Sequence, residues 1–487
     1  MRSTPVVLVG LICLMAACKP KNKHEVSLRL IAPDFKNTMV LLYTLGVVDS
    51  EMDTLGTVQL DSLGNAILQL EIEKPVFASL SVDSRWGEIY LQPGYNMSVV
   101  IPKVDTIPLI FSGIGKAINN YLATADAVKK RSEQRIGYTF MQLPEPVAFQ
   151  ELVHQTIDSL QVFHAGYVDT VTLSSADEHL VRARNAVNLF FACEIYRYNY
   201  SAMNPQVRFD AQLPLEIPEL PNGKHIPLDS TLVSHQLASY GGAVQIYFFN
   251  TYFQELDKDS LFRSNPQMQA LRPMLINGMI KRDKHLPALQ ELLLAKNLDF
   301  NLAMMGITPA LDSAYESFKK EYPSSQWRSV VDKRYNKWAL LQPGNSAPDF
   351  SGVTVSGDTV HLSAFKGKLV FIDVWATWCG PCVAEIPASK KLRQKFENNN
   401  NLVFLNFSID QDVERWKNKV LADPDWKDVQ LLESNTAWEK TVKAKYMIWG
   451  IPRYMLIDAD GQIITVNAAR PSDPELEKTL SDLLQAI

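Results

Sequence analysis

The stretch VFIDVWATWCGPC, residues 370–382, decides how the C-terminal part of this chain is interpreted. The apolar run that begins at Val370 predicts a buried β-strand, and the pattern from Val383 onward predicts a helix. Cys379 and Cys382, spaced C-x-x-C, would then lie at the first turn of that helix. A strand that delivers a dithiol to the start of a helix is typical of proteins that exchange thiols and disulfides.

Segments on both sides of this stretch extend the alternation of strands and helices. Gly357 and Asp358 lie between two strand-like runs and predict a hairpin turn. Asp460 and Gly461 predict a second tight turn. The order strand, helix, strand, helix, hairpin and helix is that of a thioredoxin fold. The later elements are expected at residues 402–409 (strand), 413–420 (helix), 454–458 and 463–466 (hairpin) and 474–484 (helix).

Residues 342–487 resemble the TlpA-like family of membrane-tethered thioredoxin-fold thiol–disulfide oxidoreductases. The residues that carry the resemblance are Trp378-Cys379-Gly380-Pro381-Cys382, Ile451-Pro452 and the opening run Ala347-Pro348-Asp349-Phe350. The resemblance implies an α/β thioredoxin-like domain outside the cytoplasm. Such a domain reduces protein disulfides through the dithiol by way of a mixed disulfide, and it uses no cofactor.

The two cysteines have different predicted roles. Cys379 would lie just ahead of the helix, where unsatisfied N–H groups and the helix dipole stabilise a thiolate, and it is the predicted nucleophile. Cys382, one turn further on, is the predicted resolving thiol that releases the product. Gly380 and Pro381 match the intervening pair of reducing thioredoxins, so the resemblance favours a reductase.

Two acidic residues near the dithiol are predicted to take part in catalysis. Asp373, six residues before Cys379, matches the buried acid of thioredoxins. A desolvated carboxyl there would have a raised pKa and could take a proton from Cys382. A hydrogen-bonded structural role is the alternative for Asp373. Glu385 matches the acid of the family's Cys-x-x-Glu pattern and could tune the thiol pKa values or contact substrate, with an exposed, solvated position as the alternative.

Further residues are predicted to bind the substrate. Ile451-Pro452 matches the cis-proline that faces the dithiol in thioredoxin folds, where the backbone of Ile451 would pair with an incoming peptide. Trp378 would shield the thiolate and offer an apolar docking surface. The predicted substrate-binding residues are Trp378, Gly380, Pro381, Ile451 and Pro452.

Two other chemistries fit parts of this domain. A structural zinc site would need two further ligands beside Cys379 and Cys382, and His361 is the only histidine in residues 342–487. Peroxidase chemistry fits the opening run at residues 347–350, which peroxiredoxins share in part, but those proteins lack the Trp-Cys-Gly-Pro-Cys motif. We therefore expect neither a metal nor a cofactor.

The first eighteen residues predict export and a lipid anchor. An apolar run at residues 6–17 follows Arg2, is too short to span a bilayer and ends in small residues. The run Leu14-Met15-Ala16-Ala17-Cys18 resembles a bacterial lipobox, which implies that Cys18 becomes lipidated and anchors the chain. A plain secretory signal is the alternative. Because Lys19 is not the aspartate that commonly retains lipoproteins in the inner membrane, we expect the outer membrane of a Gram-negative cell envelope, facing the periplasm.

Cysteine usage supports a functional dithiol. Two of the five cysteines, Cys13 and Cys18, belong to the signal. Among the other three, the pair Cys379–Cys382 is the one plausible intramolecular disulfide, so it is expected to be used rather than structural. Cys193 lies in an apolar helical stretch and is expected to be a buried, inert thiol rather than a third redox group.

Composition and pattern predict a multidomain globular protein. The 487 residues are 46% apolar and 21% charged, and the net charge of −5 gives no electrostatic footprint for nucleic acid. A period of two at residues 25–113 predicts an antiparallel β-sandwich. This region resembles the small accessory β-domain of unknown function that is often fused ahead of thioredoxin-like domains in Gram-negative lipoproteins. Helical spacing at residues 114–340 predicts an α-helical domain, followed by the thioredoxin-like domain at 342–487.

Two classes of function follow. In the first, the chain reduces disulfide-bearing proteins or supports cytochrome c maturation, and a thiol-type electron donor in the membrane keeps it reduced. In the second, it is a binding or assembly lipoprotein whose β and helical domains recognise a partner while the redox domain is ancillary. The set Asp373, Cys379, Cys382 and Pro452 favours the first class, because a purely structural role needs none of their side-chain chemistry.

Overall fold

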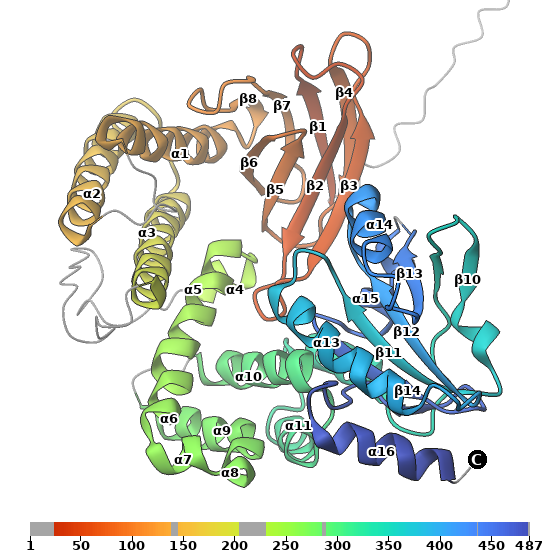
Figure 1. Cartoon of the computed structure of the whole chain (residues 1–487). Helices are drawn as coiled ribbons and strands as arrows, with labels where there is room; N and C mark the ends of the chain where they lie inside the picture. The colour runs from red at the N-terminus through yellow and green to blue at the C-terminus, as the bar shows by residue number, and fades with distance from the viewer. Residues whose placement is uncertain (1–23, 138–144, 204–229, 285–288, 436, 486–487) are drawn as a thin grey trace, which may run out of the picture. The chain divides into compact units, whose positions relative to one another are not determined.

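The computed structural model describes residues 24–137, 145–203, 230–284, 289–435 and 437–485 (Figure 1). The predicted signal peptide and Cys18 lie outside these residues. The chain divides into two compact units, Met1–Glu255 and Leu256–Ile487. This boundary falls inside the helical segment 114–340, so the division into four parts stays a prediction. Within the described ranges, the helices are too short or too polar to cross a membrane.

The first unit begins with two four-stranded sheets, of strand order β4-β1-β7-β8 and β3-β2-β5-β6. Apolar side chains of both sheets, among them Leu28 and Val99 of the first and Val40 and Leu80 of the second, form one core cluster. The strands are β1 Glu25–Ile31, β2 Met39–Leu45, β3 Met52–Gln59, β4 Asn65–Glu71, β5 Val76–Val82, β6 Arg85–Leu91, β7 Asn96–Val100 and β8 Ile110–Ile114.

One strand pair departs from the antiparallel pattern predicted for this region. Strands β1 and β7 pair in parallel, with Leu28 opposite Met97. The chain crosses to the other sheet for β2 and β3, and again for β5 and β6, before β7 returns beside β1. Alternation of apolar residues shows which face of a strand is buried, and it carries no information on the direction of the neighbouring strand.

Helices follow the two sheets in the first unit. The helical spacing read from the sequence is confirmed, since Phe149 and Leu152 of α2 and Leu180 and Val187 of α3 are buried. Cys193 is likewise buried in α3. The helices are α1 Lys116–Ile136, α2 Pro146–Val168, α3 Ser175–Met203, α4 Ser230–Ser234 and α5 Ala238–Phe248, continued by a π-helical turn at Phe249–Phe253.

The second unit starts inside a short helix and continues through further short helices to a group of four longer ones. A buried ion pair joins two of these helices, with Arg334 Nε of α12 2.6 Å from Asp299 Oδ1 of α10. The helices are α6 Gln254–Lys258, α7 Ser260–Ser264, α8 Pro266–Ala270, α9 Arg272–Arg282, α10 Gln290–Met305, α11 Pro309–Glu321 and α12 Arg328–Ala339.

A seven-stranded sheet forms the rest of the second unit, in the order β10-β9-β13-β12-β11-β14-β15. Strands β11, β12 and β13 run parallel, and β14 pairs antiparallel with β11. The strands are β9 Ser351–Val353, β10 Thr359–His361, β11 Leu369–Trp375, β12 Leu402–Ser408, β13 Val429–Glu433, β14 Arg453–Ile457 and β15 Ile463–Thr465. The predicted order of elements is confirmed, except that it lacks β13 and the short helix Val442–Lys445.

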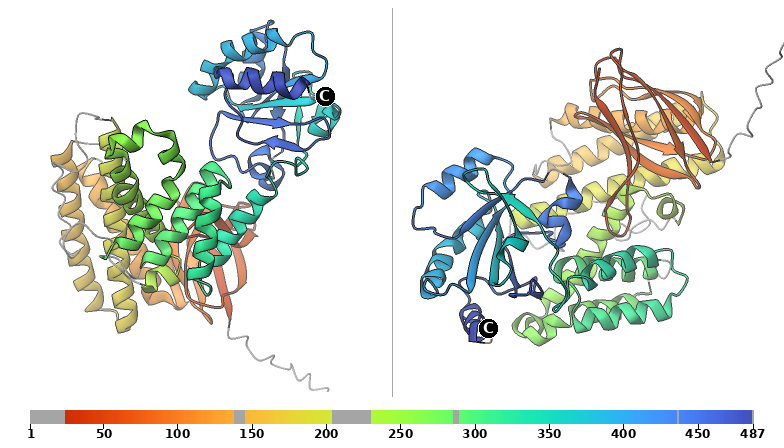
Figure 2. Two further views of the ribbon diagram at one scale, coloured as in Figure 1. Left: turned by 90° about the horizontal axis from the view of Figure 1, so that it is seen from below. Right: turned by 90° about the vertical axis from the view of Figure 1, so that its right-hand side faces the viewer.

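Helices cover the central strands of this sheet, and each position of β11 is buried. Leu392 of α13 and Leu476 of α16 pack on Leu369 and Phe371, so α13 and α16 lie on the same face of the sheet (Figures 1 and 2). Burial on both faces explains why β11 reads as a continuous apolar run. The helices are α13 Gly380–Lys395, α14 Val413–Leu421, α15 Val442–Lys445 and α16 Pro474–Gln485, with 3₁₀ turns at Leu362–Phe365 and Trp438–Lys440.

Candidate active site

The dithiol lies between the central strand and the helix that follows it. Strand β11 ends at Trp375, and Cys379 is the N-cap residue of α13. Cys379 and Cys382 are joined by a disulfide, with their Cα atoms 5.3 Å apart. The backbone N–H of Cys382 donates a hydrogen bond to Cys379 Sγ over 3.2 Å. The predicted position of Cys379 is therefore confirmed, and helix N–H groups are placed to stabilise negative charge on its sulfur.

The two cysteines are buried while a neighbouring tryptophan is exposed. Cys379 and Cys382 belong to an apolar cluster that includes Trp375 and is packed on one side by Ile451. Trp375 is a core residue, with its ring 5.0 Å from that of Trp426. Trp378 is 58% exposed, which is the position expected of an apolar surface for an incoming polypeptide.

Asp373 is buried on β11, two residues before the strand ends. Burial, with the nearby charges of Asp428 and Glu385, raises the pKa of Asp373 well above its usual range. Its Oδ1 atom has no hydrogen-bond partner among the described residues. This atom therefore gives no support to the alternative prediction, in which Asp373 is a hydrogen-bonded structural residue. A buried carboxyl of raised pKa holds a proton more readily than an ordinary aspartate, which makes Asp373 a candidate for proton exchange during catalysis.

A second buried acid, Asp428, was missed by the sequence reading. Its Oδ2 atom accepts hydrogen bonds from Asn406 Nδ2 at 2.9 Å and from Trp426 Nε1 at 3.0 Å. Arg393 Nε lies 2.8 Å from its Oδ1 atom. Burial raises the pKa of Asp428, and these partners oppose the rise. Asn406 on β12 lies opposite Asp373 of β11 in the pairing of the two strands. Polar residues therefore extend across the sheet from Asp373 to Asn406 and Asp428.

A polar residue inside the otherwise apolar run of β12 is the signal that could have pointed to this group. Asn406 stands in LVFLNFS, where each position is buried. A buried amide must find hydrogen-bond partners, so Asn406 alone predicts a polar neighbour in the fold. The sequence does not say that the neighbour is Asp428, because that pairing depends on the register between β12 and the segment before β13.

Glu385 is buried on α13, and the alternative of an exposed, solvated position is wrong. Its carboxylate accepts hydrogen bonds from the backbone N–H and the hydroxyl of Ser472, each at 2.9 Å. Arg470 Nη1 lies 3.8 Å from Glu385 Oε1. The observed contacts hold the segment before α16, and the charge of Glu385 contributes to the raised pKa of Asp373. Direct contact of Glu385 with substrate stays a prediction.

The Ile451–Pro452 peptide bond is cis, as the sequence predicts. Ile451 packs on the cluster that contains both cysteines, and β14 begins at the next residue, Arg453, opposite Val374 of β11. The cis-proline is thereby placed beside the end of the strand that leads to the dithiol. Pro452 also borders a cavity of 480 Å³.

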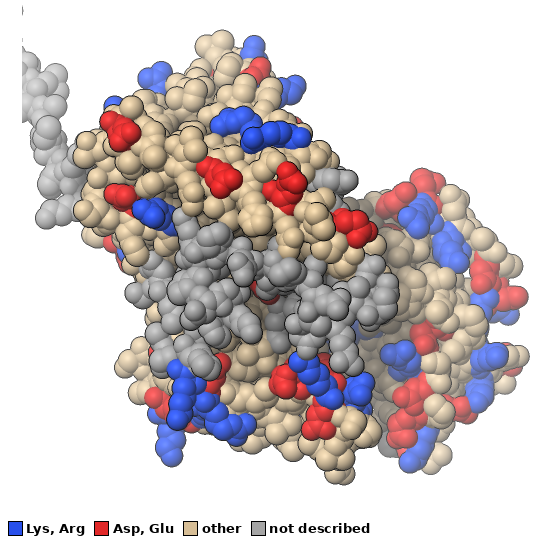
Figure 3. Space-filling view, turned by 90° about the vertical axis from the view of Figure 1, so that its left-hand side faces the viewer, with Lys and Arg blue, Asp and Glu red and all other residues tan. Residues whose placement is uncertain are grey.

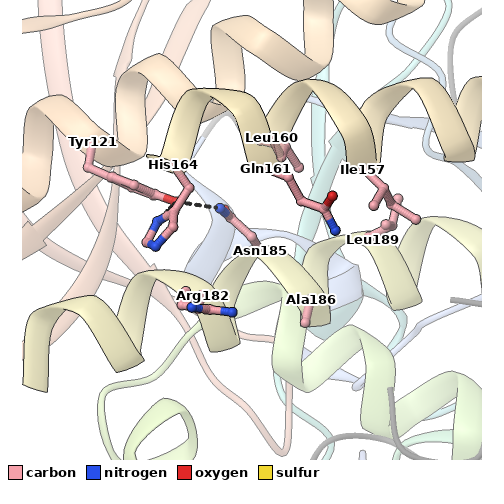
Figure 4. Close-up of a pocket in the computed structure, with 9 residues that line it drawn as sticks. All are labelled: Tyr121, Ile157, Leu160, Gln161, His164, Arg182, Asn185, Ala186 and Leu189. Carbon is pink, nitrogen blue, oxygen red and sulfur yellow. Dashed lines mark hydrogen bonds between the residues drawn. The ribbon is translucent and has the colours of Figure 1, made fainter. Parts of the chain in front are cut away.

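The first unit contains cavities of its own. One of 120 Å³ lies between α1, α2 and α3, where the side chains of Tyr121, His164 and Asn185 point toward one another (Figure 4). Tyr121 OH is 3.0 Å from His164 Nδ1 and accepts a hydrogen bond from Asn185 Nδ2 at 3.3 Å. A larger cavity of 630 Å³ is lined by the second sheet and by α1, α2, α3 and α5.

Buried charge lines the larger cavity. Arg184 donates hydrogen bonds to Glu88 and Asp126, each over 2.7 Å. On the surface in Figure 3, acidic and basic side chains are interspersed among the described residues that face the viewer.

Comparisons with known proteins concern the C-terminal domain. The Redoxin family model matches residues 342–486. Thioredoxin-like protein YneN of Bacillus subtilis is 32% identical over 143 residues, which cover 29% of this chain and 79% of that protein. Thiol-disulfide oxidoreductase ResA of Bacillus cereus is 28% identical over 149 residues, covering 31% of this chain and 83% of that protein. A crystal structure of the thioredoxin domain of a thiol-disulfide oxidoreductase from Bacteroides vulgatus is 28% identical and covers 30% of this chain and 99% of that one, with a TM-score of 0.27.

The fold, the dithiol and the sequence relatives together define a class of enzyme. The C-terminal domain is that of a thioredoxin-like thiol–disulfide oxidoreductase. Through it, this chain belongs to the Redoxin family.

Proposed function

We propose that this chain is an extracytoplasmic, TlpA-like reductase of protein disulfides. The observation that carries the proposal is the position of Cys379, whose sulfur accepts the N–H of Cys382 at the start of α13. A thiolate at a helix N-terminus is stabilised at neutral pH, so the reduced enzyme would hold a ready nucleophile. The buried Asp373 of β11, whose pKa is raised, would accept a proton, and the cis bond at Pro452 would align the substrate.

The reaction begins with attack of the Cys379 thiolate on one sulfur of the substrate disulfide. The substrate S–S bond breaks, a disulfide forms between Cys379 and the substrate, and the other substrate sulfur leaves as a thiolate that takes up a proton. Cys382 then gives its proton to the Asp373 carboxylate and attacks Cys379 Sγ. The mixed disulfide breaks, the Cys379–Cys382 disulfide forms, and the second substrate thiolate leaves and is protonated. Two electrons have passed from the dithiol to the substrate.

The enzyme needs an electron donor and a location where disulfides occur. We propose that a thiol-type electron donor in the membrane reduces the Cys379–Cys382 disulfide back to the dithiol. We also propose that Cys18 carries the lipid anchor and that the domain faces the periplasm from the outer membrane. Protein disulfides persist outside the cytoplasm, which agrees with a secreted reductase. Apocytochromes awaiting haem attachment are one class of substrate that such a reductase would serve.

The reduction potential of the Cys379–Cys382 couple tests the direction of the reaction. We expect a reduction potential near that of thioredoxin, roughly −270 mV, because a reductant must have a lower potential than the disulfides it reduces. The measurement equilibrates the purified protein in redox buffers of defined potential, alkylates the free thiols and follows the gel shift. A value near the roughly −120 mV of strong oxidants would instead indicate disulfide formation.

A second candidate function is the binding of a ligand or partner by the first unit. The observation in its favour is the cavity of 630 Å³, a volume within the range of small-molecule sites. Inactivation of the dithiol separates the two functions, since a binding function would survive the loss of Cys379.

A further inference from the structure

The cavity beside Pro452 contains more positive than negative charge. Its charged lining residues are Arg453, Arg470 and Asp473. Asp473 Oδ1 accepts the N–H of Glu475 in the first turn of α16, so this oxygen is already engaged. Two guanidinium groups therefore share the cavity with one carboxylate.

Arg453 has no counter-ion among the residues that the structure describes. It directly follows Pro452 and is half-buried, and burial lowers the pKa of its guanidinium. It donates a hydrogen bond from Nη1 to Asn467 Oδ1, and no carboxylate of the described residues pairs with it. Removing a cation from water without a partner is costly unless the site is built to receive an anion.

Arg470 adds a second donor at the edge of the cavity. Its side chain is 65% exposed, and its nearest carboxylate, Glu385, lies at 3.8 Å. Both oxygens of Glu385 already accept hydrogen bonds from Ser472. Arg470 consequently keeps donors available for an incoming group, and arginine binds carboxylates in a planar, two-pronged geometry.

The helical part of the second unit shapes the apolar wall of this cavity. Met304, at the end of α10, and Trp449 line it. The guanidinium of Arg334, on α12, lies 4.8 Å from the centre of the Trp449 ring. Asn467 Nδ2 donates to the carbonyl of Met305 over 3.5 Å. The side chains of Met304 and Trp449 are half exposed, so they flank an ion pair formed here with apolar surface without closing it off from water, and they strengthen it only in part.

We propose that this cavity binds a carboxylate that the substrate carries close to its disulfide, with Arg453 and Arg470 as the recognising groups. The inference rests on the proposed function, in which the substrate polypeptide runs past Pro452. The substrate class is thus a protein with an aspartate or glutamate next to the reactive cysteine. Oxidised glutathione carries carboxylates too, and the experiment separates this source.

The test uses reduced full-length protein in excess over short peptides, so that one turnover is followed without an electron donor. Each peptide carries one cysteine linked by a disulfide to 2-mercaptoethanol, a neutral leaving group, and has Glu, Gln or Lys beside the cysteine. We expect the Glu peptide to be reduced about tenfold faster than the Gln peptide at low salt, equivalent to about 1.4 kcal/mol. The Lys peptide should be slowest, and added salt should reduce the differences.

The variants Arg453→Gln and Arg470→Gln should each lower the preference for Glu. Arg470 is exposed, so its variant keeps the test open if Arg453→Gln fails to fold. Arg415→Gln on α14 removes the same charge from an exposed residue that does not line the cavity, and it should keep the preference.

Each outcome bears on one proposal. Equal rates for the Glu and Gln peptides, or a preference that survives both substitutions together, would overturn the carboxylate site and leave the reductase intact. Reduction of none of the peptides would overturn the proposed function itself. Reduction of oxidised glutathione faster than the Glu peptide, with the same dependence on Arg453, would overturn the protein substrate class in favour of a small disulfide.

Discussion

Replacing Cys379 by serine is expected to abolish disulfide reduction, with a loss on the order of 10⁴-fold or more, as for other enzymes that lose their nucleophile. A serine hydroxyl stays protonated at neutral pH and cannot form the mixed disulfide, although the N–H of Cys382 would still face it. The measurement is single-turnover reduction of a peptide disulfide by the prereduced protein. Cys193→Ala is the matched control, because it removes a buried cysteine of the first unit and should keep the activity.

The variant Cys382→Ser gives the complementary result. Here the first step proceeds, but no resolving thiol follows it, so the covalent adduct between Cys379 and the substrate should accumulate and be visible on a non-reducing gel. An adduct that forms in Cys379→Ser but not in Cys382→Ser would reverse the two roles. A cellular phenotype that needs the chain yet survives Cys379→Ser would instead support the binding function of the first unit.

Residues whose position depends on local sequence were predictable. Cys379 lies at the helix start because an apolar strand precedes it and Pro381 follows at a position that favours helix initiation. Gly357 and Asp358 do turn the chain between β9 and β10, where Val360 pairs with Gly352. In these cases the interactions that hold the residue come from within a few positions of the chain, and the sequence displays them.

Residues whose position depends on distant partners were not predictable. Glu385 is buried because Ser472, 87 positions away, supplies both of its hydrogen bonds. Asp428 is linked to Asp373 by Asn406, which hydrogen-bonds Asp428 and lies opposite Asp373 in the paired strands β11 and β12. The sequence alone does not specify the register of these parallel strands. The short strand β13 was missed for the same reason, since five residues at the edge of an apolar pattern become a strand only when β12 is beside them.

Replacing Asp373 by asparagine is expected to slow the second chemical step on the order of 100-fold at neutral pH, the lower range of general acid–base catalysis. Without the carboxylate, Cys382 must lose its proton to water before it attacks Cys379. Rapid mixing that follows decay of the mixed disulfide measures this step separately from its formation. The deficit should shrink above pH of about 8.5, where a thiol ionises without help. Unchanged decay of the mixed disulfide across this range would remove Asp373 from the mechanism.

The same variant is expected to be more stable than the parent protein at alkaline pH. The pKa of Asp373 is raised on folding, so the unfolded chain loses this proton at lower pH than the folded protein does. The parent therefore loses stability as the pH rises from the unfolded pKa, near 4, to the folded pKa. Asparagine never ionises and escapes this loss.

The gain from Asp373→Asn should be present at pH 9 and should vanish below pH of about 4, where the carboxyl is protonated in the folded and the unfolded chain alike. Urea unfolding of the two oxidised proteins at both pH values measures it, with Asp425→Asn, an exposed acid of the same domain, as the control that should show no such gain. A variant whose stability relative to the parent does not rise between pH 4 and pH 9 would mean that the Asp373 carboxylate is compensated in the folded protein. A raised pKa and a role as proton acceptor for Cys382 would then both be untenable, because each requires that burial disfavour the ionised form.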